Sequence, residues 1–122
     1  GGFCLRLKLP DDISFFSVDS TVTPRETPVS AGPWMDFNGS FQGGAFPQSG
    51  LAVFCPPADH QGSQQWILRR EKSMQNVVYP GRNPIILTPQ GLRLKYRIVI
   101  HHNRIGNQDL KKLYQQFIDH SE

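Results

Sequence analysis

The sequence lacks the features that most directly identify a class of protein. It contains no run of about 18 apolar residues, so we predict no membrane-spanning segment and no membrane partner. No charged and then apolar leader precedes the first strand-like segment, so we predict no signal peptide. The 122 residues suffice for one domain, 1–122, which is either a whole protein or a fragment that meets the remainder of a parent protein.

Cysteine is scarce, and its spacing argues against metal chemistry. The two cysteines, Cys4 and Cys55, form neither a CxxC pair nor a zinc-binding pattern. Each lies in an apolar, strand-like run, which favours buried free thiols, whereas a disulfide between neighbouring strands is the alternative for an exported protein. We predict no metal site and no cofactor.

The net charge and its distribution give no sign of a polyanionic partner. The net charge is +3, and ten of the thirteen Lys and Arg residues lie from Arg69 onward. These cations are spread along the chain and form no dense cluster, a pattern that is typical of solvated faces. We therefore expect no nucleic-acid partner.

Strict alternation over residues 92–100 is the clearest structural signal that the chain does contain. One phase is apolar and the other carries Arg93, Lys95 and Arg97 and continues to His101. A period of two predicts a half-buried strand with its apolar phase on the core. Ile98→Asp is accordingly expected to unfold the domain, and Arg97→Ala to have a small effect.

Further short segments have strand composition and are separated by turn signals, while residues 20–33 predict an irregular connection with one short edge strand. The predicted strands are 3–9, 13–18, 34–41, 51–55, 65–70, 76–79 and 85–87. Residues 107–120 instead show the 3.6-residue period of an amphipathic helix. The sequence therefore predicts an all-β, antiparallel β-sandwich with one C-terminal amphipathic α-helix.

Five segments in this order resemble the C-terminal half of the PmoA-like family. They are Gly1-Gly2-Phe3-Cys4-Leu5-Arg6, Trp34-Met35-Asp36-Phe37-Asn38-Gly39, Gly50-Leu51-Ala52-Val53-Phe54, Trp66, and residues 92–101. That family is found in carbohydrate-degrading bacteria and looks related to galactose-mutarotase-like β-supersandwich folds. The resemblance implies a carbohydrate-linked role and a chain that is either half of a supersandwich or a smaller sandwich built from the same strands.

Three side chains are candidates for acid–base chemistry. His60 follows Asp59 in the loop after the strand at 51–55, while Asp36 and His101 lie on strand-like segments. Carboxylate and imidazole groups are common general acids and bases, but no spacing here shows that these three converge. Of the pair His101-His102, only His101 shares a strand face with Arg97.

Five residues are candidates for ligand binding: Arg6, Trp34, Trp66, Arg97 and His101. An indole ring can stack on the C–H face of a sugar, and Trp34 shares its strand phase with the polar Asp36 and Asn38. Arg6 and Arg97 would form a carboxylate- or hydroxyl-binding patch if their strands were neighbours on one face. The alternatives are that both tryptophans belong to the core and that both arginines are simple surface charges.

The sequence thus favours a carbohydrate-related domain that binds or processes its ligand through a polar sheet face. The alternative is an accessory or structural domain with no active site of its own.

Overall fold

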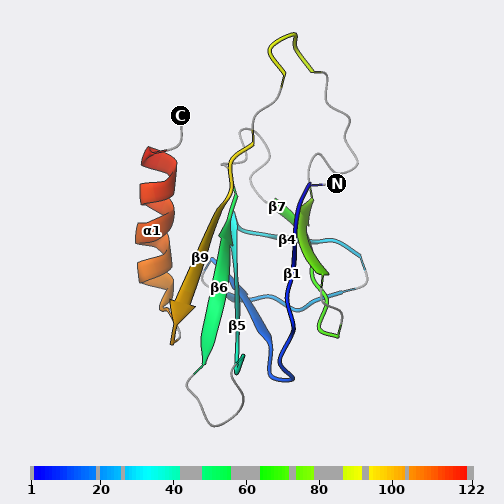
Figure 1. Ribbon diagram of the computed structural model, residues 1–122, viewed down its shortest axis with the longest axis vertical. Coiled ribbons are helices and arrows are strands. Elements are labelled where there is room, and N and C mark those ends of the chain that lie inside the picture. The colour runs from blue at the N-terminus through cyan, green and yellow to red at the C-terminus, as the bar shows by residue number, and fades with distance from the viewer. Residues whose placement is uncertain are drawn as a thin grey trace.

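The computed structural model describes residues 2–18, 20–25, 27–41, 48–55, 64–71, 74–78, 87–91, 94–103 and 105–120. Within them, an α-helix and two antiparallel sheets form three layers, with the five-stranded sheet between the helix and the four-stranded sheet (Figure 1). The predicted sandwich with a C-terminal helix is therefore confirmed.

Both sheets are built from short strands. The four-stranded sheet runs in the order β1 (Gly2–Arg6), β8 (Met74–Val78), β7 (Gln64–Ile67), β4 (Val29–Ala31). The five-stranded sheet runs in the order β3 (Ser20–Thr21), β2 (Ser14–Ser17), β5 (Trp34–Gly39), β6 (Ser49–Phe54), β9 (Arg97–His102). The third layer of the fold is the helix α1 (Asn107–Asp119), which lies within the predicted helical range 107–120.

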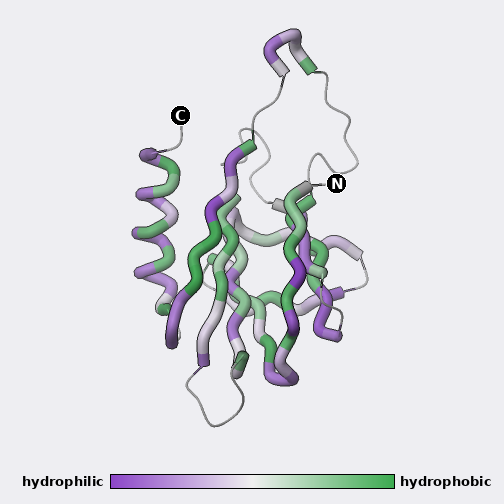
Figure 2. The backbone as a smooth tube through the Cα atoms, viewed as in Figure 1, coloured by the Kyte–Doolittle hydropathy of each residue, from purple (hydrophilic) through white to green (hydrophobic). Residues whose placement is uncertain are grey.

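The main hydrophobic core lies between the two sheets. Phe15 and Phe37 are register partners on β2 and β5, and their rings meet edge to face with centroids 5.7 Å apart. Trp66 on β7 is 1 % exposed and belongs to the same cluster, and its indole Nε1–H donates to the carbonyl of Gly32 at 3.1 Å. Successive strand residues point to opposite faces, and Figure 2 shows hydrophobic and hydrophilic residues along the strands of both sheets.

A second cluster joins the opposite face of the five-stranded sheet to α1. Trp34, Ala52 and Phe54 from β5 and β6 pack against helix residues spaced by three and four: Leu110, Tyr114 and Phe117. The Tyr114 hydroxyl also donates to the backbone carbonyl of Cys55 at 2.9 Å. The predicted central strand at 51–55 is thus buried on both faces, as expected.

The strand predicted at 92–100 corresponds to β9, but its covered face differs from the prediction. Ile98 and Ile100 pair with Val53 and Leu51, which puts them on the face toward the four-stranded sheet, yet they are 46 % and 80 % exposed. β9 is the last strand of its sheet, and the four-stranded sheet does not extend over it. Because α1 covers the other face, Val99 packs inward and His101 is buried.

One more sequence prediction needs correction. Neither cysteine forms a disulfide, but Cys4 is exposed on β1 and only Cys55 is buried. Burial raises the pKa of the Cys55 thiol to about 12. The predicted strand at 85–87 lies mostly outside the described residues. Leu87 itself is exposed and precedes a turn that the Gly91 N–H closes on the Thr88 carbonyl.

The face assignment of β9 is testable with two neighbouring substitutions. Val99→Asp should lower the free energy of unfolding by about 2–4 kcal/mol, because it places a charge against the helix. Ile100→Asp should cost less than about 1 kcal/mol, because that carboxylate stays in water. Urea unfolding of both variants measures the difference, and a larger loss for Ile100→Asp would show that the assignment is reversed.

Candidate functional site

Polar side chains gather on the face of the five-stranded sheet that α1 covers only in part. The strand register aligns Phe16, Asp36, Ala52 and Val99 in one row across four strands. The next row holds Asn38, Gly50 and His101. The sequence predicted that Asp36 and Asn38 share a phase, but only the register of β5, β6 and β9 brings His101 to the same place.

Asp36 and His101, 65 residues apart in sequence, form a buried ion pair. His101 Nε2 lies 2.6 Å from Asp36 Oδ1, and His101 Nδ1 lies 2.6 Å from the carbonyl oxygen of Asn103. Asp36 Oδ2 accepts a further hydrogen bond, 2.7 Å long, from the side-chain amide of Asn38. Since both ring nitrogens face oxygen acceptors, the geometry fits an imidazolium that donates through both.

The pKa of His101 reflects opposing effects. Burial lowers it, but the hydrogen bond to Asp36, the bond to the Asn103 carbonyl and the charge of the Asp36 carboxylate together raise it above its usual 6.5. Folding therefore favours the charged ring. The resulting stabilisation is complete below about pH 6.5 and declines as the pH rises through the raised pKa.

Gly50 provides the space in which the imidazole lies. A Cβ atom at this position would fall 2.6 Å from His101 Cε1, 2.7 Å from His101 Nε2 and 2.5 Å from the backbone oxygen of Phe37. Any side chain would therefore displace the ring or the neighbouring strand. Sequence reasoning missed Gly50, although a glycine at the head of an apolar strand run is a signal of close approach.

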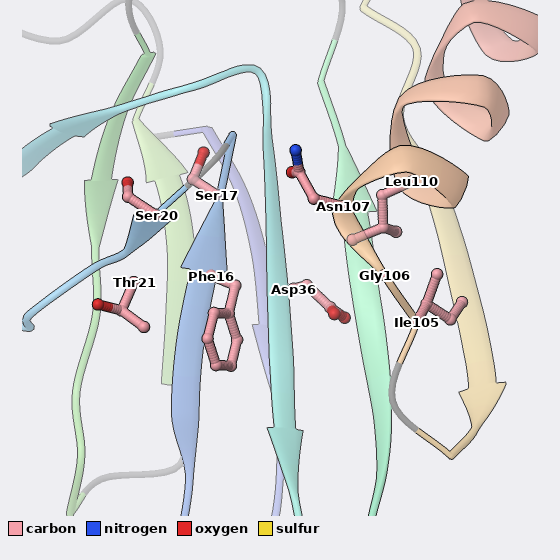
Figure 3. Close-up of a pocket in the computed structure, with 9 residues that line it drawn as sticks. All are labelled: Phe16, Ser17, Ser20, Thr21, Asp36, Ile105, Gly106, Asn107 and Leu110. Carbon is pink, nitrogen blue, oxygen red and sulfur yellow. The ribbon is translucent and has the colours of Figure 1, made fainter.

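An open pocket of about 540 Å³ lies beside this pair, between β2, β3 and β5 and the start of α1. Figure 3 shows the Phe16 ring and the Asp36 carboxylate on neighbouring strands, with Asn107 and Leu110 of the helix on the other side. The hydroxyl-bearing Ser17, Ser20 and Thr21 complete one wall. The pocket thus combines an aromatic ring with hydroxyl, amide and carboxylate groups.

The structure separates the other predicted ligand-binding residues from this pocket. Trp34 and Trp66 are 3 % and 1 % exposed, so neither indole offers a face for stacking. Arg97 lies with its guanidinium carbon 5.2 Å from the centroid of the Phe117 ring, on the helix. Arg6 is on β1 in the other sheet, so it does not form the predicted patch with Arg97.

The remaining predictions concern a loop, a metal site and a membrane span. His60 and its neighbour Asp59 lie in 56–63, outside the described residues. Across the described ranges, no group of three or more His, Cys, Asp and Glu side chains is placed to hold a metal ion. No helix in the described part of the chain has the length and apolar character needed to cross a membrane.

Two buried polar atoms near the pair have no hydrogen-bond partner within the described part of the chain. They are Trp34 Nε1 and Asn38 Oδ1. The orphan oxygen belongs to the same amide that donates to Asp36. Buried polar groups are nearly always hydrogen-bonded, so these two atoms are exceptions to the usual pattern.

Comparison with known proteins gives a family but no characterised relative. A family model, described as a family of unknown function, matches residues 1–115. No curated protein matches the chain, and no solved structure does either.

The role of Gly50 gives a direct test of the site's construction. Gly50→Ala should lower the free energy of unfolding by about 1–3 kcal/mol, because the new methyl group overlaps His101 and the Phe37 backbone. Gly106→Ala is the matched control, since a Cβ there meets no atom within 4 Å. Urea unfolding compares them, and equal losses would contradict the close approach at Gly50.

Proposed function

We propose that this chain, which belongs to the DUF6807 family of unknown function, binds a carbohydrate in the pocket beside Asp36. The observation that carries the proposal is the position of Phe16 and Asp36 together in the wall of the pocket. The two residues are register partners on β5 and β2, and both line the pocket. Sugar sites need an aromatic or apolar surface for C–H groups and a few fixed polar groups for hydroxyls.

Asp36 is a fixed and buried part of the pocket wall. Its side chain is 1 % exposed, and His101 and Asn38 fix the orientation of its carboxylate. Ser20 and Thr21 are exposed at the same pocket and carry hydroxyls that can donate or accept. A preorganised acceptor on rigid strands loses little entropy when a ligand binds.

The same contacts favour binding over acid–base catalysis. A general base needs a nitrogen or oxygen free to take a proton, whereas both ring nitrogens of His101 already have partners. The resemblance of the chain to PmoA-like proteins supports carbohydrate as the ligand class. It is a resemblance in short segments, and the ligand remains our proposal.

A specific observation also favours the alternative of an accessory domain with no active site. Both tryptophans are buried, and the Asp36–His101 pair is itself a complete structural contact. On this alternative the pair serves only to hold β5, β6 and β9 together.

Calorimetric titration of the folded chain with a panel of mono- and oligosaccharides distinguishes the two. We expect at least one sugar to bind, and Phe16→Leu to weaken its binding by about 2–10-fold because the aromatic contact is lost. Thr21→Val should also weaken binding, while Thr88→Val, an exposed position outside the pocket, should not. Absence of binding by every sugar would refute the proposal in favour of the accessory domain.

A further inference from the structure

A second pocket adjoins the first along β3. Its volume is about 460 Å³, and it lies where β3 and the segment after it face β4. Ser17, Ser20 and Thr21 line both pockets, so the two pockets share these residues as a wall. In Figure 3, Ser20 and Thr21 lie on the side of Phe16 that is away from Asp36, and Ser17 lies above the Phe16 ring.

The second pocket differs from the first in its charge. Arg25 is the one charged residue among its described lining residues, which otherwise supply hydroxyl, backbone and aliphatic groups. Within the described ranges Arg25 is exposed and makes no ion pair. By contrast, Arg69 and Arg70 donate to backbone carbonyls, and Arg97 lies over the Phe117 ring.

The first pocket presents little net charge to a ligand. The Asp36 carboxylate is 1 % exposed, and its Oδ1 lies 2.6 Å from His101 Nε2, whose raised pKa favours the positive ring. An anionic ligand is therefore not repelled there, while Arg25 offers one positive charge at the adjoining end. A single guanidinium among hydroxyl groups matches the single charge of a carboxylate, whereas a phosphate, with about −1.5 to −2 charge, is better matched by several cations.

We propose that the carbohydrate is a sugar acid, whose carboxylate pairs with Arg25 while its hydroxyls lie toward the first pocket. Ser17, Ser20 and Thr21 lie between the two ends, at the junction of the pockets. This inference rests on the proposed carbohydrate binding and narrows its ligand class. It also gives β3, a strand of only two residues, a role as the shared wall of the two pockets.

Parallel titrations with a uronate, its neutral parent sugar and the corresponding sugar phosphate test the inference. The unmodified chain should bind the uronate more tightly than the other two. Arg25→Gln should weaken uronate binding about tenfold or more and leave the neutral sugar unchanged. Added salt should weaken binding of the uronate and leave binding of the neutral sugar unchanged, because salt screens the charge pair with exposed Arg25.

Two control variants make the result specific. Arg6→Gln removes the same charge from β1, outside both pockets, and should leave uronate affinity unchanged. Arg25→Lys keeps the charge and should recover part of the affinity, less than arginine gives in a bidentate pair.

The titration results distinguish a wrong sugar-acid assignment from a wrong proposal of carbohydrate binding. If the neutral sugar binds as tightly as the uronate and Arg25→Gln changes neither, the Arg25 site is wrong and carbohydrate binding stands. If the phosphate binds most tightly through Arg25, the carboxylate assignment is wrong. If no sugar of any kind binds, both proposals are refuted.

Discussion

The contact between His101 and Asp36 is the constraint on which the rest of the site depends. At 2.6 Å it ties the edge strand β9 to β5 across β6, and it requires Gly50 between them to have no side chain. Two buried charges are costly to bring together unless their geometry is good and their other hydrogen bonds are satisfied. Here the Asn103 carbonyl and the Asn38 amide supply those bonds.

This contact also explains how one sheet has two different faces. Toward the four-stranded sheet, the five-stranded sheet is apolar and fully packed over β2, β5 and β6. Toward α1, it is apolar only beneath the helix, around Trp34 and Phe54, and polar beyond the helix's first turn. The pocket forms at that boundary. Its polar groups are therefore carried by strands that the core holds rigidly, which is the arrangement a binding site needs.

Much of the fold follows from sequence periodicity, but the site does not. Alternation predicts the phase of β9 correctly, yet it cannot say that a helix would cover the Val99 and His101 side and leave Ile100 in water. The shared phase of Asp36 and Asn38 was readable from β5 alone. Their contact with His101 depends on the register of three strands, and pairing between strands far apart in the sequence leaves no signal in the local sequence pattern. Trp34 and Trp66 show the opposite problem. Their side-chain type suggested stacking on a sugar, but the structure buries both indole rings.

The charge state of His101 is the central claim of this account, and nitrogen-15 NMR of its ring tests it most directly. We expect a titration of the ring signals to give a pKa above the usual 6.5, with both ring nitrogens carrying protons below that pKa. Arg97→Ala, which leaves the pair intact, serves as a control and should not change this result. A pKa at or below 6.5 would contradict the ion pair and with it the proposed construction of the pocket.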